Sequence, residues 1–156
     1  MLADEEAARF IGGVQTTAGA WHAMAAMVGA WHLNGFSNFS VIKKSNGAWI
    51  GRVGPWQPAG WPGPEIGWAL TRSAWGNGYA TEAAARTIDW VISELGWERV
   101  IHIINPANKA SIAVAERLGS VLIEGVDTSG IAAETRLLIY GRQLDDWHRE
   151  PRARGA

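Results

Sequence analysis

The residues best suited to chemistry in this chain form the run Trp75-Gly76-Asn77-Gly78-Tyr79-Ala80-Thr81, which stands between an expected strand and a long expected helix. Its small residues leave backbone N–H groups uncovered, and the first N–H groups of a helix have no partner within the helix. That end of a helix also carries partial positive charge. The run, which we name the glycine turn, therefore predicts a site for a phosphate or pyrophosphate group.

Four interpretations of the glycine turn differ in their ligand. A dinucleotide fingerprint requires a third Gly, where this chain has Thr81, and an acidic residue after the following strand, where the strand expected at Arg99–Ile104 has none. A nucleoside triphosphate loop requires Gly-Lys followed by Ser or Thr, which this turn lacks. The turn could also merely connect a strand to a helix. Coenzyme A, through its pyrophosphate, fits the pattern best.

The composition is that of a soluble globular domain. The chain has 156 residues, of which 47% are apolar and 19% charged, so one domain with a core is expected. The absence of Cys excludes disulfides and thiolate catalysis. A net charge of −1 gives no reason to expect nucleic acid as a partner. No apolar run is long enough to span a membrane and no signal peptide is evident, so a cytoplasmic protein without a membrane partner is expected.

Ten Trp residues are spread along the chain. Most are expected to pack in or near the core, because a Trp side chain buries a large area. Trp56 and Trp61 differ, since they flank a Pro- and Gly-rich loop at 55–64. Aromatic side chains on such a loop more often contact a ligand or a partner.

Hydrophobic periodicity and turn residues place the elements that would hold the glycine turn. Helices are expected at 4–11, 18–33, 80–95 and 108–118. Strands are expected at Phe39–Lys43, 49–54, Glu65–Leu70, Arg99–Ile104, 121–124 and 135–140, with a hairpin at Asn46-Gly47. This order predicts an α+β fold with a mixed sheet.

Three further runs occur with the glycine turn: Glu65-Ile66-Gly67-Trp68-Ala69-Leu70 before it, and Asn108-Lys109-Ala110-Ser111 and Glu116-Arg117-Leu118-Gly119 after it. Together they resemble the GNAT superfamily of N-acetyltransferases, and within it the branch that includes the ribosomal-protein alanine acetyltransferases. The resemblance covers residues 4–142. It implies a mixed, mostly antiparallel central sheet flanked by helices, with residues 1–148 as one acetyltransferase domain and 149–156 as a flexible tail.

The resemblance implies acetyl-CoA as the acetyl donor. The family's pyrophosphate turn has Gln or Arg, then Gly, then Gly or Ala, and the matching positions are Trp75, Gly78 and Ala80; Trp75 departs from the polar first residue. Backbone N–H groups of residues 76–81 would bind the pyrophosphate, and the main chain at Trp68–Leu70 would bind pantetheine. The implied donor site is Trp68, Ala69, Leu70, Trp75, Gly76, Asn77, Gly78, Tyr79, Ala80, Thr81 and Asn108.

Acetyl transfer to an amine needs a base for the amine and a proton for the departing thiolate. By position in the family Glu65 is the expected base, with a solvated strand-edge carboxylate as the alternative interpretation. Glu82 is the alternative candidate for the base, although a carboxylate in the first turn of a helix is already explained by its favourable interaction with the helix dipole. Many relatives use a Tyr as acid where this chain has Ala115, so Ser111 is the expected donor, and an ordinary helix-start Ser is its alternative.

The histidines do not predict a metal site. His22 and His32 are ten residues apart on one expected helix, which is not a zinc-binding spacing. His102 lies inside an expected strand, where a hydrogen-bonded core residue is the better interpretation. No metal is expected.

Relatives begin with a strand and the start of a helix before the equivalent of Asp4, so the sequence given either starts late or belongs to a protein that lacks this edge strand. The edge of Phe39–Lys43 would then be open, which would allow a homodimer. The combined hypothesis is a single-domain enzyme that transfers acetyl directly to a primary amine, on a protein amino terminus or a small molecule. Loop 55–64 and helix 18–33 should line the acceptor side. The alternative is a non-catalytic acyl-CoA-binding module.

Overall fold

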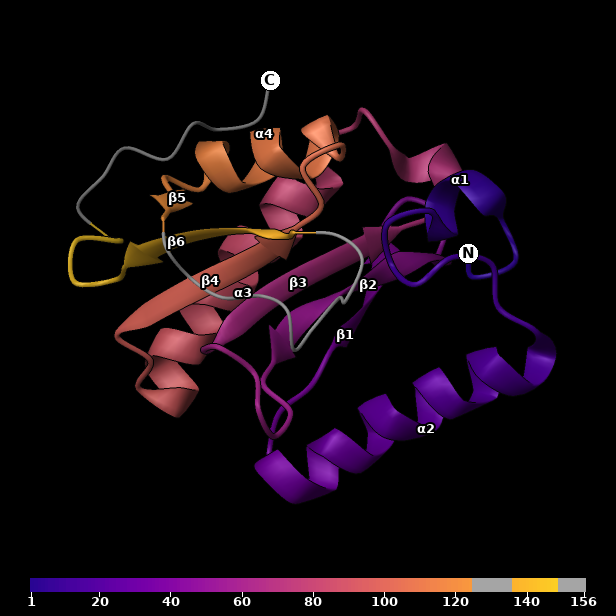
Figure 1. Ribbon diagram of the computed structural model, residues 1–156, viewed down its shortest axis with the longest axis horizontal. Coiled ribbons are helices and arrows are strands. Elements are labelled where there is room, and N and C mark those ends of the chain that lie inside the picture. Colours follow the sequence, from indigo (N-terminus) through magenta and orange to yellow (C-terminus); the bar gives the residue numbers. More distant parts are fainter. Residues whose placement is uncertain (125–135, 149–156) are drawn as a thin grey trace.

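The computed structural model describes residues 1–124 and 136–148. In chain order the elements are α1 (Glu5–Ala8), α2 (Thr17–Asn34), β1 (Phe39–Lys43), β2 (Ala48–Trp56), β3 (Glu65–Leu70), the short 3₁₀ helix η1 (Arg72–Ala74), α3 (Tyr79–Leu95), β4 (Arg99–Ile104), α4 (Lys109–Arg117), β5 (Val121–Ile123) and β6 (Leu138–Gln143). Figure 1 shows them around one central sheet.

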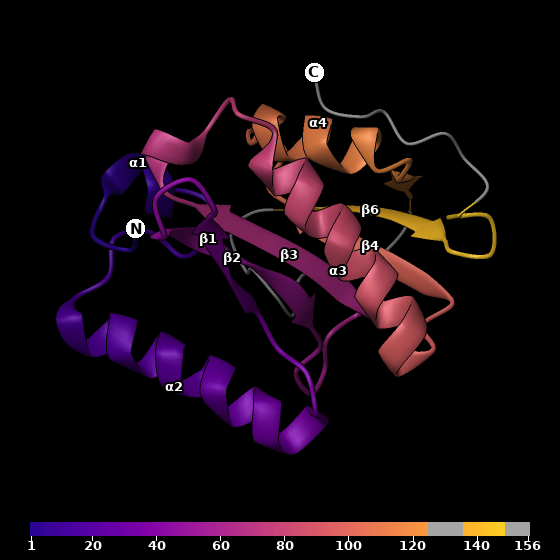
Figure 2. The ribbon, with the colours of Figure 1, turned by 180° about the vertical axis from the view of Figure 1, so that it is seen from behind.

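The described strands form a six-stranded sheet in the order β1-β2-β3-β4-β6-β5. Every neighbouring pair is antiparallel except β3 and β4, which are parallel. Two of the helices, α3 and α4, cover one face of this sheet (Figure 2). The predicted α+β fold with a mostly antiparallel sheet is therefore confirmed. Among the described residues β1 is an edge strand.

Helix α3 provides the main apolar layer on the sheet. Its buried residues Ala84, Thr87, Ile88 and Val91 are three or four positions apart and so share one face. The helix ends where Gly96 adopts a left-handed φ of 63°, as a C-terminal Gly commonly does. The apolar ones among these buried residues form one buried cluster with residues of β2, β3 and the α4 region, namely Val53, Ile66, Leu70, Val114 and Leu118.

Helix α2, with 18 residues against the 17 of α3, is built differently. None of its residues is buried, and Trp21, Val28 and Leu33 are 61%, 54% and 86% exposed. It contains no charged Asp, Glu, Lys or Arg. Its contact with the rest of the fold includes Trp31, whose ring meets Phe39 and Trp90 edge-on. Both ribbon views show α2 beside the β1 edge of the sheet.

Several predicted boundaries need correction. The first helix spans only Glu5–Ala8 rather than 4–11, because the side chain of Asp4 caps it and glycines follow at 12 and 13. Strand β2 continues through Pro55 and Trp56, so the Pro- and Gly-rich loop begins at 57. The last strand begins at Leu138 rather than 135, and position 135 lies outside the described residues, as does the tail 149–156.

The Trp residues follow the expectation only in part. Trp147 is buried, and Trp68, Trp90 and Trp97 pack against the core cluster. Trp21, Trp49 and Trp75 are exposed. Despite the apolar character of α2, no helix in the described part of the chain is both long and apolar enough to cross a membrane.

Candidate active site

The glycine turn leads from η1 directly into α3. Gly76 and Gly78 have φ of 73° and 76°, a left-handed conformation that other residues rarely adopt. A Cβ added to either Gly would have no atom within 4 Å, so both face open space. Gly78 caps α3 without any side-chain hydrogen bond. The N–H groups at the start of α3 therefore lack a side-chain cap, as a phosphate-binding helix start requires.

Two side chains of the turn brace it from within. The indole Nε1 of Trp75 donates to the carbonyl of Leu70 at 3.1 Å. The Nδ2 of Asn77 donates to the carbonyl oxygens of Ala74 and Trp75, at 3.3 and 2.8 Å. Trp75, which departs from the family's polar residue, thus fastens the turn to the end of β3. The side chains hold the loop in shape while its backbone N–H groups stay available.

Strands β3 and β4 separate next to this turn. They pair at one position only, Glu65 with Ile101. By contrast, β4 pairs with β6 over its whole length, from Arg99 to Ile104. Half of the backbone groups of a strand point to each side, so beyond Glu65 the side of β3 that faces β4 lacks the ladder that a full pair would supply. This split leads from Glu65 toward the glycine turn.

Glu65 lies at the closed end of the split and is 9% exposed. Its Oε2 accepts a hydrogen bond from Nε1 of Trp61 at 2.6 Å, and its Oε1 accepts one from the backbone N–H of Ile103 at 3.3 Å. Burial raises the pKa of Glu65 to about 7, against the lowering effect of these two bonds and of the Arg52 charge. A carboxyl group with this pKa can take up a proton near neutral pH.

The two faces of β3 separate the predicted catalytic residues. Side chains alternate along a strand, so Glu65 points away from the face that carries Trp68. Trp68 Nε1 donates to Ser111 Oγ at 3.1 Å, and the Oδ1 of Asn108 accepts from the Ser111 backbone N–H at 3.1 Å. The structure thus brings Trp68, Ser111 and Asn108 together. Asn108 uses Oδ1 to cap α4.

His102 is a structural residue, as the sequence predicts. It is 1% exposed, and its Nδ1 lies 2.8 Å from the carbonyl oxygen of Ile66, which can only accept. The proton is therefore on Nδ1, and Nε2 accepts from the hydroxyl of Ser120 at 3.1 Å. Burial lowers the pKa of His102 to about 4. Within the described ranges no group of three His, Cys, Asp or Glu could hold a metal ion.

Ala115 occupies the position where many relatives carry a Tyr that acts as the general acid, and it is fully buried. It packs with Ile104 of β4 and Tyr140 of β6. There is consequently no hydroxyl at this position, and Ser111, one helical turn earlier, is the nearest hydroxyl along α4.

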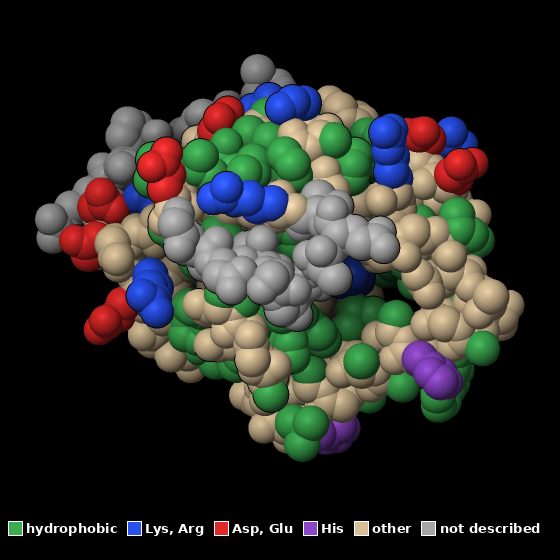
Figure 3. All heavy atoms as spheres, viewed as in Figure 1, with side chains coloured by type: hydrophobic (Ala, Val, Ile, Leu, Met, Phe, Trp, Pro, Cys, Tyr) green, Lys and Arg blue, Asp and Glu red, His purple; other side chains and the backbone are tan. Residues whose placement is uncertain are grey.

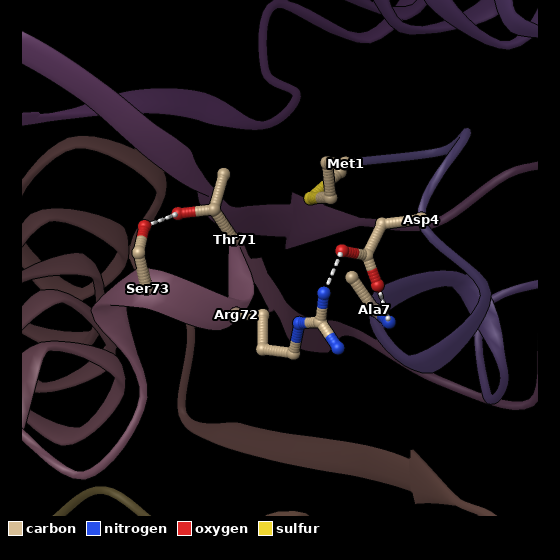
Figure 4. A pocket seen from close by; sticks show the side chains of 6 residues that line it. All are labelled: Met1, Asp4, Ala7, Thr71, Arg72 and Ser73. Atoms are coloured by element: carbon tan, nitrogen blue, oxygen red, sulfur yellow. Dashed lines mark hydrogen bonds and ion pairs between the residues drawn. The ribbon is translucent and has the colours of Figure 1, made fainter.

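A cavity of about 310 Å³ lies at the other end of β3 from Glu65 (Figure 4). Its lining residues are Met1, Asp4, Ala7, Thr71, Arg72 and Ser73. Arg72 and Asp4 form an ion pair across it at 3.3 Å. None of these residues was predicted as a site residue from the sequence, although Ser73 is only two positions before the first residue of the glycine turn, Trp75.

Arg52 is a residue that sequence reasoning missed. It lies in the middle of β2, and burial lowers its pKa while the charge of Glu65 raises it. The available signal was a single charged residue in the otherwise uncharged strand Ala48–Trp56. Its role in the fold is not to pair with Glu65, since no ion pair between these two described residues is present.

Comparison with known proteins identifies the family. Residues 1–121 match the acetyltransferase (GNAT) domain family. The chain is 39% identical over 87 residues to YkkB of Bacillus subtilis, an alignment that covers 54% of this chain and 51% of YkkB. The chain thus spans about half the length of the curated relatives it matches.

Solved structures agree with this match. An acetyltransferase from Agrobacterium tumefaciens superimposes with a TM-score of 0.80 at 28% identity, covering 90% of this chain and 80% of that one. The ribosomal-protein-S5-alanine acetyltransferase from Vibrio fischeri gives 0.66 at 25% identity, covering 87% and 75%. The same fold is seen in yncA of Salmonella typhimurium, solved with acetyl-CoA, with a TM-score of 0.62, 22% identity and coverage of 85% and 78%.

The chain therefore belongs to the GNAT acetyltransferase family. It has the mostly antiparallel sheet and the helix layer of that fold.

Proposed function

We propose that this protein is an N-acetyltransferase that moves an acetyl group from acetyl-CoA directly to a primary amine. The backbone N–H groups of residues 76–81 bind the pyrophosphate, and the unpaired side of β3 at Trp68–Leu70 binds the pantetheine arm. The observation that carries the proposal is Glu65, a buried carboxyl group with a pKa of about 7 at the point where β3 and β4 separate.

Glu65 acts as the general base. In its ionised form it accepts a proton from the attacking amine, either directly or through a water molecule. The amine nitrogen then forms a bond with the thioester carbonyl carbon, and the C–S bond breaks. Direct transfer needs no acyl-enzyme, which is consistent with a chain that has no Cys.

Ser111 acts as the general acid and protonates the departing thiolate. The indole of Trp68 can only donate, so Ser111 Oγ must accept the bond between them. The hydroxyl hydrogen of Ser111 is then free for another acceptor. Because a thiolate needs little help near neutral pH, this contribution is smaller than that of Glu65.

The test is calorimetric titration with acetyl-CoA, followed in the same sample by release of free thiol with a panel of amines and short peptides. Binding with amine-dependent thiol release supports the proposal. Binding without turnover on any amine favours the non-catalytic acyl-CoA-binding module, for which the missing hydroxyl at Ala115 is the supporting observation. Absence of binding contradicts the assignment of the glycine turn.

The chain offers a matched pair of variants for the binding step. Gly78 and Gly47 both have left-handed φ, of 76° and 71°, and a Cβ at either would meet no atom within 4 Å. Gly78→Ala and Gly47→Ala should therefore lose similar stability, about 1 kcal/mol each. Only Gly78→Ala should weaken acetyl-CoA binding, by about tenfold or more. Equal affinity in both variants would contradict the site.

A further inference from the structure

Arg52 and Glu65 point to the same face of the sheet, opposite α3 and α4. In the β2–β3 register Arg52 is opposite Ala69, Gly54 opposite Gly67, and Trp56 opposite Glu65. Directly opposed residues share a face. We name the face formed by Arg52, Gly54, Glu65, Gly67 and Ala69 the Glu65 face. Figure 3 views the molecule from this side, where the surface is hollowed between α2 and the sheet.

The centre of the Glu65 face is built from residues without long side chains. Gly54 cannot carry a side chain, because an added Cβ would lie 2.5 Å from the Cα of Asn38. A Cβ at Gly67 would lie 3.7 Å from Oε1 of Glu65, so any longer side chain there would crowd the carboxyl group. The space over Gly54 is therefore filled by the backbone of residues 37–39, whereas on β3 Gly67 and Ala69 project no more than a methyl group from this face.

The guanidinium group of Arg52 is incompletely paired. Its Nη1 donates to Oδ1 of Asn38 at 3.0 Å, whereas its Nε is buried and has no hydrogen-bond partner. The two nitrogens not used by Asn38, Nε and Nη2, form one edge of the guanidinium plane. That edge matches the two oxygens of a carboxylate. An unpaired N–H of a buried cation is costly, so a ligand that satisfies it binds with a gain.

Glu65 does not supply the missing partner. No ion pair joins it to Arg52 among the described contacts, and its two oxygens already accept bonds from Trp61 and Ile103. Burial raises the pKa of Glu65 to about 7, so this group is only partly ionised near neutral pH. The guanidinium group of Arg52 is thus an incompletely paired cation, and the nearby carboxyl group of Glu65 can act as a base.

We propose that the acceptor is a primary amine that also carries a carboxylate, with the carboxylate bound by Arg52 and the amine presented to Glu65. This inference rests on the proposed function and narrows its acceptor to amino-acid-like molecules. Arg52 is a specificity residue that holds one end of the acceptor and takes no part in bond making. A polyamine would place a second positive charge against the guanidinium group of Arg52. A simple amine without a carboxylate would leave this group without a partner.

The experiment compares matched acceptors by thiol release: amino acids against their carboxamides, β-alanine and γ-aminobutyrate to vary the spacing, and spermidine as a carboxylate-free amine. The wild type should prefer a carboxylate over its amide by about 10- to 100-fold in kcat/KM, as expected for charge-assisted hydrogen bonds. Arg52→Gln should remove this preference and leave acetyl-CoA affinity unchanged. Arg52→Lys should retain part of it, and Arg99→Gln, at an exposed position on β4, should retain it fully.

A second measurement separates this inference from the proposed function. Calorimetry of the same acceptors with the CoA-loaded protein reports binding without turnover, and melting curves confirm that each variant is folded. Arg52-dependent binding of carboxylates supports the inference even if no thiol is released, in which case the proposed function fails alone. Turnover with amides or spermidine equal to that of carboxylates, or a preference that survives in Arg52→Gln, overturns the inference and leaves the proposed function standing.

Discussion

The two faces of the central sheet differ in how completely their polar groups are satisfied. On the face covered by α3 and α4, His102 is buried and both of its ring nitrogens are hydrogen-bonded. On the opposite face Glu65 is also buried, but Arg52 beside it keeps an unpaired Nε. A satisfied buried network stiffens a core, whereas an incomplete one is costly unless a ligand completes it. The comparison indicates that the face under α3 and α4 holds a satisfied polar pair within its core, whereas the opposite face keeps a polar group that a ligand could satisfy.

Strand β3 contributes to both faces through alternate residues. Ile66 and Leu70 belong to the buried apolar cluster under α3, while Glu65 and Gly67 face the other way. A substitution at neighbouring positions of one strand should therefore affect either stability or activity, and seldom both. The predictions that follow test this separation.

Glu65→Gln should give the largest effect, because it removes the base and keeps the size of the side chain. We expect kcat to fall by about 10²- to 10⁴-fold, the usual contribution of a general base. Amine-dependent thiol release measures it. Glu82→Gln, at the exposed first turn of α3, is the matched control and should retain full activity. An equal loss of kcat in both variants would contradict the assignment of the base to Glu65 rather than to Glu82.

His102→Ala should affect stability instead. It leaves the Ile66 carbonyl and the Ser120 hydroxyl unpaired and opens a cavity, at a cost of about 2–5 kcal/mol in the free energy of unfolding. Urea denaturation monitored by circular dichroism measures this cost. Where the variant is folded, kcat should stay within a few-fold of wild type. A well-folded His102→Ala protein without activity would contradict the separation of the two faces.

The same two residues should give opposite pH dependences of stability. The pKa of His102 is lowered from 6.5 to about 4, so its contribution is lost as pH falls from 6.5 toward 4. The pKa of Glu65 is raised from 4.5 to about 7, so stability is lost as pH rises through that interval. Unfolding of Glu65→Gln should therefore become harder with rising pH, and that of His102→Gln easier, each by at most about 1.4 kcal/mol per pH unit.

Trp61→Phe should move the pH dependence of the rate. The wild-type rate should rise with pH through about 7, as Glu65 ionises. The indole hydrogen bond lowers the pKa of Glu65, so its removal should shift this limb to higher pH. Trp56→Phe is the control, since Trp56 is opposite Glu65 in the sheet but donates no hydrogen bond to it among the described contacts. If the rate of Trp61→Phe rose over the same pH range as that of the wild type, the ionisation of Glu65 would not be the cause of this rise.

Ser111→Ala should have the smallest effect, a decrease in kcat of only a few-fold, because the thiolate is a good leaving group near neutral pH. Ser73→Ala, on η1 away from α4, is a suitable control. A loss of about a hundredfold or more would instead assign Ser111 an essential role in proton donation.

Much of the fold could be predicted because its signals are local. The glycine turn, the apolar stripe of α3 and the hairpin at Gly47 each depend on a few neighbouring residues. The position of Glu65 at the start of β3 also follows from local sequence. The short α1 and the extension of β2 through Pro55 depend on caps and cross-strand pairing, which the local pattern does not contain.

The site could be predicted less completely, because its geometry is set by distant contacts. Trp61 was placed on the acceptor side, but its bond to Glu65 depends on how the loop folds back over β3. The contact between Trp68 and Ser111 spans 43 residues. Arg52 was missed because its unusual environment comes from its burial against Asn38, and a lone Arg in a strand is otherwise unremarkable as a signal.

The pairing of β3 with β4 at a single position, Glu65 with Ile101, has a consequence for hydrogen–deuterium exchange. Backbone amides in a ladder exchange slowly with deuterated solvent, whereas amides without a partner exchange fast unless they are buried. Amides of β3 that face the split should therefore exchange earlier than those of β4, which pairs with β6 along its full length. Bound acetyl-CoA would act as the missing strand, and it should slow this exchange selectively, leaving the hairpin of β1 and β2 as it was.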